Sequence, residues 1–218
     1  PVARLFESER ERMMKLEERI GGRVFGQSHA IELAANAARQ MRTDLRRTKR
    51  PASFLFVGPT GVGKTEMSKA LAEALFDDED SLIRIDMAEY KDSSSVAGLI
   101  GSRPGLVGSD EGGFLTERVR RQPYSIVLFD EVEKAHPRIM DILLQVIEEG
   151  RLTDGRGNPT YFSETVVILT SNLGSDVTMR MAAAGESSLS VEELGKALRP
   201  TLNRHFKPAL LARMTVVP

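Results

Sequence analysis

The chain has 218 residues, no cysteine and a formal net charge of −1, because 30 Lys and Arg residues nearly cancel 31 Asp and Glu residues. These values exclude disulfides and thiolate metal sites, and they give no whole-molecule attraction to nucleic acid or to an anionic membrane. No apolar stretch approaches the roughly 20 residues that span a bilayer, and we find no signal peptide. We therefore expect one globular domain, 1–218, that is a piece of a longer cytoplasmic protein with no membrane partner.

Two helices are predicted before the first strand. Residues 3–20 are rich in charge with apolar residues at helical intervals, and Gly21-Gly22 ends this lead-in segment, which we assign to 1–22. A second helix is predicted from about residue 27 to residue 47. Its basic tail either contacts a nucleic acid or a neighbouring subunit, or is a solvated helix end whose cations favour the helix dipole. The tail consists of Arg42, Arg46, Arg47, Lys49 and Arg50.

A phosphate-binding loop is predicted between an apolar strand at 53–57 and a helix at 63–76. The loop fits the pattern Gly-x-x-x-x-Gly-Lys-Thr, in which glycines let backbone N–H groups point at phosphate oxygens beside a helix N-terminus. Lys64 would contact the β- and γ-phosphates, and Thr65 would ligate Mg²⁺. The alternative is a glycine-rich turn without a ligand, but the flanking strand and helix favour the phosphate loop. Its residues are Gly58, Pro59, Thr60, Gly61, Val62, Gly63, Lys64 and Thr65.

Two adjacent acids follow a second buried strand. The apolar, β-branched run at 125–129 predicts that strand, and Asp130 and Glu131 come at its carboxyl end, where open α/β sheets bind their ligands. Asp130 would hold Mg²⁺ directly or through water, and Glu131 would be the general base for an attacking water. The alternative is a pair of solvated acids that cap a strand. A phosphate loop in the same chain favours the catalytic interpretation.

The rest of the chain alternates strands with helices, which predicts an α/β fold with a parallel sheet. We expect a mobile polar segment at 175–190 and a solvated acidic loop at 77–80. The other predicted elements are strands at 82–86, 165–170 and 214–217, helices at 93–100, 113–122, 137–149 and 191–206, a loop at 101–113 and a turn or hairpin at 151–159.

Four strings carry a family resemblance: Glu-Gly-Gly-Phe-Leu-Thr at 111–116, the run from Arg120 to Pro137, Gly-Arg-Leu-Thr-Asp-Gly at 150–155, and Thr-Ser-Asn-Leu-Gly at 170–174. They resemble the second ATPase module of Clp-type AAA+ chaperones, above all the ClpB disaggregase group, and the resemblance covers nearly the whole chain. It implies the large subdomain of an AAA+ P-loop NTPase, with a parallel five-stranded sheet between helices. We expect the small helical lid domain of the family to lie outside this chain.

The resemblance implies ATP or ADP with Mg²⁺ as ligands, and it assigns further site residues. Val24 and Phe25 would border the adenine, and Glu66 would extend the nucleotide-binding loop. Asn172 matches the sensor residue that helps to place the lytic water, with a simple strand cap as the alternative. Arg213 matches the arginine finger that reaches the nucleotide of a neighbouring subunit.

The resemblance also implies a pore loop at 105–108, in which Leu106 and Val107 would press on a threaded polypeptide. The family usually carries an aromatic residue at the position of Leu106. Leucine offers less contact area and no stacking, which puts the strength of the grip in question.

The function implied is ATP-driven threading of unfolded or aggregated polypeptide through a ring, in this family a hexamer, with a co-chaperone as a candidate partner. Residues 197–213 are also similar to ClpV, the recycler of the type VI secretion sheath, which is the main alternative. A nucleic-acid motor or loader is disfavoured, because 101–113 carries one Arg beside two acids. A scaffold that has lost catalysis is disfavoured by the intact set Lys64, Asp130, Glu131 and Asn172.

Overall fold

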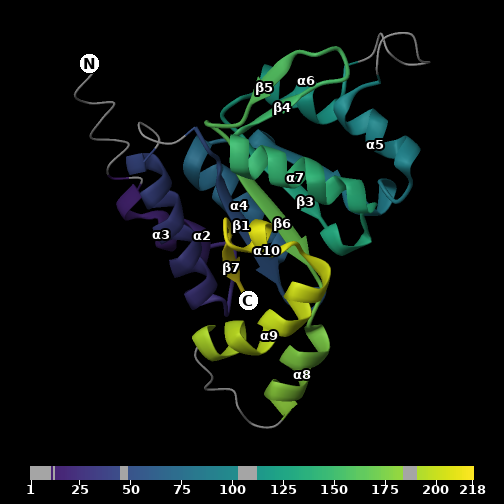
Figure 1. Cartoon of the computed structure of the whole chain (residues 1–218). Helices are drawn as coiled ribbons and strands as arrows, with labels where there is room; N and C mark the ends of the chain where they lie inside the picture. The colour runs from purple at the N-terminus through teal and green to yellow at the C-terminus, as the bar shows by residue number, and fades with distance from the viewer. Residues whose placement is uncertain (1–10, 12, 45–48, 103–111, 184–190) are drawn as a thin grey trace.

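The fold is built on a central parallel sheet. A computed structural model describes residues 11, 13–44, 49–102, 112–183 and 191–218. Within them, five parallel strands lie in the order β2-β3-β6-β1-β7 (Figure 1). The predicted α/β fold with a parallel five-stranded sheet is confirmed. The strands are β1 (Ala52–Val57), β2 (Leu82–Asp86), β3 (Ile126–Asp130), β6 (Val166–Ser171) and β7 (Thr215–Val217).

The inner strands β3 and β6 are buried along their whole length, as their Val, Ile and Leu content predicts for strands covered on both faces. They pair in register, with Val127 opposite Val167. Strand β1 pairs with β6 so that Val57 lies opposite Ser171, and β2 pairs with β3 so that Asp86 lies opposite Asp130. The carboxyl ends of these strands therefore meet at one edge of the sheet.

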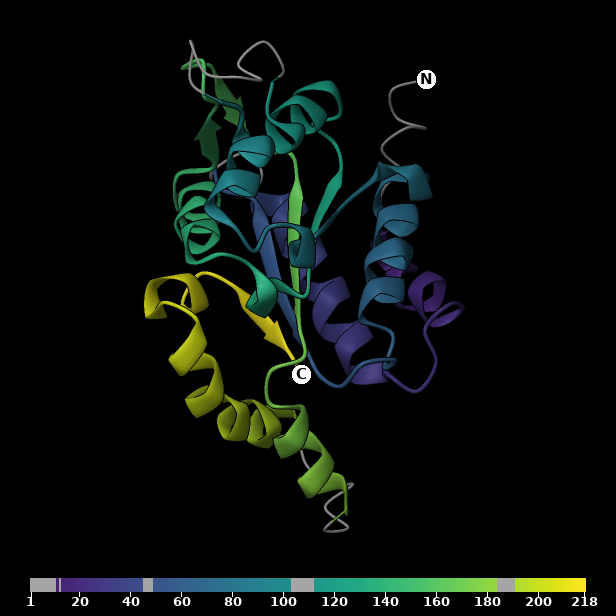
Figure 2. The same cartoon turned by 90° about the vertical axis from the view of Figure 1, so that its right-hand side faces the viewer.

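Helices cover both faces of the sheet, as Figures 1 and 2 show. Successive side chains of a strand point to opposite faces, so Phe54 and Ile168 enter one hydrophobic core while Leu55 and Leu169 enter the other. The first core is closed by α2 (Leu16–Gly21), α3 (Ser28–Asp44) and α4 (Lys64–Phe76). The second is closed by α5 (Ser93–Ile100), α6 (Phe114–Arg121), α7 (Pro137–Glu149) and α9 (Val191–His205).

The expectation of a mobile polar segment after β6 is wrong for its first half, which forms helix α8 (Ser175–Ala183). Gly174 turns the chain with φ 75°, a backbone angle that glycine adopts without strain. The Thr178 amide then donates to the Gly174 carbonyl at 3.0 Å, and Met, Arg and Ala in the segment favour a helix. Residues 184–190 lie outside the described part of the chain. A short helix that we did not predict, α10 (Pro208–Leu211), precedes β7.

The acidic segment at 77–80 is exposed, as expected, but local and long-range contacts order it. Asp78 accepts a hydrogen bond from the Asp80 amide at 2.9 Å and so caps the 3-10 helix Glu79–Ser81. Glu79 forms ion pairs with Arg23 and Lys69. Composition alone could not reveal a partner that lies far away in the sequence. The segment predicted as a turn or hairpin is a hairpin, since β4 (Arg151–Thr153) pairs with β5 (Pro159–Tyr161) antiparallel.

Some predictions fall on residues that the structure does not describe. They include the pore-loop residues Leu106 and Val107, the start of the lead-in helix, and Arg46 and Arg47 of the basic tail. Arg50 of that tail donates to the backbone carbonyl of Glu148 at 2.7 Å. Among the described helices, none combines the length and apolar character needed to cross a bilayer.

Candidate active site

The predicted phosphate loop connects the carboxyl end of β1 to the first residue of α4. Gly61 and Gly63 have φ angles of 86° and 100°, in the left-handed region that residues with a Cβ rarely enter. Gly63 precedes α4 directly, so the free N–H groups of the first helical turn lie beside the loop. This geometry is suited to holding an anion, because those N–H groups and the helix dipole both favour negative charge.

Lys64 is held by three oxygens at the end of the loop. Its Nζ donates to the carbonyls of Gly58 at 2.6 Å and Pro59 at 2.7 Å, and to Oδ1 of Asn172 at 2.8 Å. Burial lowers the pKa of Lys64, and neighbouring carboxylates, of which Glu133 has the largest effect, partly oppose that shift. The ammonium therefore lies in a partly desolvated position, where its interaction with a phosphate is stronger than in water.

Asn172 connects the loop to the acidic residue Glu131. Its Oδ1 accepts from Lys64 and, at 3.4 Å, from the hydroxyl of Thr60, and its Nδ2 donates to Oε1 of Glu131 at 3.0 Å. Its backbone N–H donates to Oε1 of Glu133 at 3.0 Å. The structure thus brings together three residues that the sequence analysis selected from separate strings: Lys64, Glu131 and Asn172.

Glu131 has a strained backbone, with φ 56° and ψ 52°. A non-glycine residue in this left-handed region costs on the order of 1–3 kcal/mol and persists only where its surroundings enforce it. The hydroxyl of Thr170 accepts from the Glu131 amide at 2.9 Å, and Lys134 Nζ donates to Oε2 of Glu131 at 2.6 Å. Together with the bond from Asn172, these contacts fix the carboxylate at the carboxyl edge of the sheet.

Asp130, the last residue of β3, is almost fully buried with both carboxylate oxygens engaged. Oδ1 accepts from the Thr170 hydroxyl at 2.5 Å, and Oδ2 accepts from Arg84 Nε at 3.0 Å and Nη2 at 2.7 Å. The second predicted metal ligand, Thr65, is the second residue of α4. Among the described residues, no group of three or more His, Cys, Asp or Glu side chains could hold a metal ion.

Sequence reasoning missed three residues that organise this site. Thr170 joins Asp130 and Glu131, Arg84 pairs with Asp130, and Glu133 accepts from the Asn172 backbone. A signal for Thr170 existed, since a hydroxyl inside an otherwise apolar buried strand needs a polar partner. Oε2 of Glu133 is buried without a hydrogen-bond partner among the described residues.

A cavity of about 160 Å³ adjoins the phosphate loop. Val24, 5% exposed, lines it as the sequence analysis expected, whereas Phe25 is 83% exposed and lies outside it. Thr178 of α8 and Leu194 of α9 also line the cavity, and neither was foreseen. The loop residues that line it are Gly58, Pro59, Val62, Gly63 and Lys64.

Two other predicted site residues lie away from this cavity. Glu66 is in the first turn of α4, and its carboxylate accepts from Arg23. Arg213 follows α10 on the surface, where its Nη2 lies 3.2 Å from Oε1 of Glu148. Neither residue lines the cavity.

The geometry agrees with a family assignment. Residues 49–217 match the family model described as AAA domain (Cdc48 subfamily). The chain belongs to this family. AAA domains are ATPase domains, so nucleotide binding is the property that the family implies for the cavity and loop of this AAA domain.

Similar proteins point to one branch of the family. Chaperone protein ClpB of Meiothermus ruber is 51% identical over 98% of this chain and 25% of its own length. The ClpB proteins of Dichelobacter nodosus and Pseudomonas putida are 52% and 50% identical over 98% and 100% of the chain, and 24% and 25% of their own lengths. This AAA domain therefore spans about a quarter of the length of these relatives.

A solved structure is similar in fold as well as sequence. A closed-state cryo-EM reconstruction of Hsp104 with ATPγS and FITC-casein superimposes with a TM-score of 0.89 at 41% identity. It covers all of this chain and 37% of the Hsp104 chain. The AAA domain thus has the fold of one portion of that assembly.

Proposed function

We propose that this AAA domain hydrolyses ATP as the second ATPase module of a ring-forming protein disaggregase. The observation that carries the proposal is the hydrogen-bonded chain from Lys64 through Asn172 to Glu131 beside the phosphate loop. Further support comes from the ClpB relatives, which are 50–52% identical across nearly the whole chain, and from the similarity to Hsp104 with ATPγS and casein.

In this proposal the nucleotide lies across the loop and the adjoining cavity. The base contacts the apolar wall that includes Val24, and the phosphates lie against the loop N–H groups and Lys64. Lys64 Nζ donates to three protein oxygens, and a γ-phosphate oxygen replaces one of these acceptors when the nucleotide binds. Phe25 is exposed, so it contributes at most to the rim of the base site.

Thr65 and Asp130 are the residues that would hold Mg²⁺. One hydroxyl and one carboxylate fit this ion, which commonly keeps several waters and takes its remaining ligands from substrate phosphates. When bound, the ion neutralises charge on the β- and γ-phosphates. Both oxygens of Asp130 already accept hydrogen bonds from Thr170 or Arg84, so these partners hold the carboxylate in a fixed orientation.

Hydrolysis requires a water aligned with the γ-phosphorus. Glu131 takes a proton from this water while the water oxygen forms a bond to the γ-phosphorus. The bond between the γ-phosphorus and the bridging β–γ oxygen breaks, which yields ADP and phosphate. Asn172 orients Glu131 through Nδ2 and contacts Lys64 through Oδ1, so it relates the base to the phosphates. Arg213 acts on the nucleotide of a neighbouring subunit, in keeping with its surface position.

The module would work within a hexameric ring that threads unfolded or aggregated polypeptide, with Leu106 and Val107 as the pore-loop contacts and a co-chaperone as a partner. A cytoplasmic location, and the absence of a nucleic-acid partner, remain predictions from the sequence. The ClpB relatives favour disaggregation over the ClpV-like sheath recycling that residues 197–213 suggested.

The proposal is tested in the full-length protein by comparing the wild type with Lys64→Ala. At about 100 times its Kd, Mg-ADP should stabilise the wild-type domain by roughly 2.7 kcal/mol, and Lys64→Ala should lose this gain. The wild type should also recover an aggregated model protein with ATP, and the variant should not. Equal stabilisation of both proteins would overturn the site, and stimulation of the ATPase by duplex DNA instead of unfolded protein would overturn the function.

A further inference from the structure

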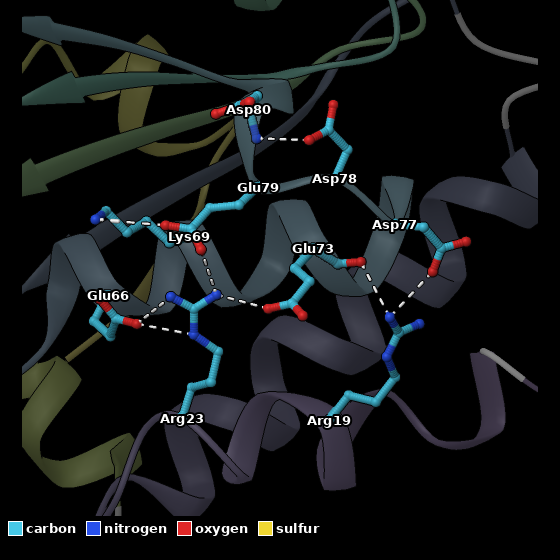
Figure 3. Close-up of polar contacts among 9 residues, drawn as sticks. All are labelled: Arg19, Arg23, Glu66, Lys69, Glu73, Asp77, Asp78, Glu79 and Asp80. Carbon is cyan, nitrogen blue, oxygen red and sulfur yellow. Dashed lines mark hydrogen bonds and ion pairs between the residues drawn. The ribbon is translucent and has the colours of Figure 1, made fainter.

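Arg23 is surrounded by three carboxylates, as Figure 3 shows. Its Nε and Nη2 donate to Oε1 of Glu66 at 2.9 and 2.6 Å. Its Nη1 donates to Oε2 of Glu73 at 2.6 Å and to Oε2 of Glu79 at 2.9 Å. The hydrogen bonds that Arg23 donates to these acids, with Glu79 first, raise the pKa of the guanidinium, so the cluster holds Arg23 firmly charged.

The acids belong to one side of helix α4 and its exit. Glu66 and Glu73 are about two helical turns apart and therefore lie on the same face, and Glu79 lies in the 3-10 helix that follows α4. Glu66 comes directly after Thr65, in the turn of α4 that begins at the phosphate loop. The arginine is thus bonded to the helix that presents its N-terminus to the phosphates.

Arg23 also adjoins the other wall of the cavity. The next residue, Val24, is 5% exposed and lines the cavity, and its Cγ1 would lie 3.8 Å from a Cβ placed on Gly63. The amides of Arg23 and Val24 both donate to the carbonyl of Ile20 at 3.0 Å, so the two residues form one tight turn after α2. Any shift of Arg23 would move Val24 with it.

We propose that Arg23 is a positioning residue for nucleotide binding, which fixes the Val24 wall of the cavity relative to the phosphate loop through Glu66. The proposal rests on the proposed nucleotide site. The link is geometrically specific, because a planar guanidinium offers a fixed fork of donors that a lysine ammonium lacks. Without the arginine, the three carboxylates would lose their shared cation, and the segment would lose these bonds to α4.

A merely structural role would predict a different result, and Arg19 provides the control. Arg19 also joins α2 to α4, but at the far end of α4, where it donates to the carbonyls of Ala74 and Glu73 and to Oδ1 of Asp77 at 3.3, 3.3 and 3.1 Å. An isolated exposed ion pair contributes little to stability. Loss of Arg19 should therefore lower the melting temperature only slightly, and loss of Arg23, which leaves three acids without their shared cation, should lower it more. Only the loss of Arg23 should weaken nucleotide binding.

The test measures binding of a fluorescent ADP analogue to the full-length protein, with the Lys64→Ala protein as the reference for any other nucleotide site. Arg23→Met should raise the Kd about three- to tenfold, Arg23→Lys should restore part of the loss, and Arg19→Met should leave the Kd unchanged. The KM for ATP should rise with the Kd while kcat stays near the wild-type value, because the lost interaction orders the site before chemistry.

Glu66→Gln identifies the partner through which Arg23 acts. It should also weaken binding, and the double variant Arg23→Met/Glu66→Gln should be no worse than Arg23→Met alone, since both changes break one link. Unchanged Kd in Arg23→Met, or an equal loss in Arg19→Met, would overturn the inference while leaving the nucleotide site intact. A wild type that binds no more analogue than Lys64→Ala would overturn the site, and this inference with it.

Discussion

Lys64 and Asn172, which are 108 positions apart in the sequence, are joined by a hydrogen bond of 2.8 Å between Nζ and Oδ1. The bond connects the first residue of α4 to the segment that follows β6. The opposite end of the same amide donates to Glu131. The Asn172 side chain therefore contacts both the candidate phosphate-binding cation and the candidate general base, so a displacement of Lys64 or of Glu131 would also shift the other.

Replacement of Asn172 by alanine should separate binding from turnover. Lys64 keeps its two carbonyl partners in this variant, so ADP should bind with nearly wild-type affinity. Loss of a positioned donor at a reacting centre typically costs about 10²- to 10³-fold in kcat. The measurement is steady-state ATP turnover above the Lys64→Ala background, beside an ADP titration. Turnover within a few-fold of the wild type would assign Asn172 the role of a strand cap.

Glu131→Gln keeps the size of the side chain and its ability to accept from Asn172, but it removes the base. We expect ATP to bind normally and turnover to fall by about 10²- to 10⁴-fold. Single-turnover kinetics with Mg-ATP would separate the chemical step from product release. A variant with wild-type turnover would mean that another group activates the water.

The sheet was predictable because its signals are local. The strands β1, β3 and β6 can be predicted from their own apolar residues alone. The glycines of the phosphate loop indicate in the sequence where positive φ angles occur. Helix α8 was missed for the converse reason. Polar and small residues outnumber the apolar ones in it, and α8 packs against α9, which comes later in the chain.

In the site, too, residues in local sequence strings were predictable, and residues with distant partners were not. Lys64, Asp130, Glu131 and Asn172 could be selected because each lies in a recognisable string at the end of a strand, and their roles stay predictions. Arg84 could not be selected, because a single Arg in an edge strand looks solvated until its pairing with β3 brings it to Asp130. The network at Arg23 was equally hidden, since its partners lie 43 to 56 positions away.

Stability below about pH 4 should depend on Asp154 at the tip of the β4–β5 hairpin. Burial alone would raise the pKa of this carboxyl, but hydrogen bonds from Asn158, Arg120 and Arg156 outweigh it and hold the pKa below its ordinary value. Because the pKa of Asp154 is lower in the folded state, its carboxylate contributes its full stabilisation at pH values above the unfolded-state pKa of about 3.9. This contribution is lost as the pH falls through the folded-state pKa. The hairpin should therefore open more readily in acid.

Asp154→Asn tests this assignment. The variant should lose about 1–3 kcal/mol of local stability at pH 7, because Arg120, Arg156 and Asn158 lose a buried charged acceptor. As the pH is lowered further, the local stability of the hairpin should fall less in this variant than in the wild type. Hydrogen-exchange protection of the hairpin amides, measured from pH 7 down to about pH 2, reports both effects. Parallel pH curves for the two proteins would show that the acid dependence has another source.

Arg213 should act on a neighbouring subunit, and its contact with Glu148 makes a matched control available. In the assembled full-length protein, Arg213→Ala should bind ADP normally, because Arg213 does not line its own cavity. Its turnover above the Lys64→Ala background should fall by about 10³-fold or more, as for arginine fingers in other phosphoryl-transfer systems. Glu148→Gln only releases an exposed ion pair, so its turnover should stay near the wild-type value.

Mixing two inactive variants decides whether the arginine acts within or between subunits. An Arg213→Ala subunit has an intact phosphate loop, and a Lys64→Ala subunit has an intact arginine. If the finger acts between subunits, co-assembled rings contain interfaces where both are present, and turnover should return in proportion to their frequency. If it acts within a subunit, every mixture should stay at the Lys64→Ala background. Full turnover by Arg213→Ala alone would remove the finger assignment.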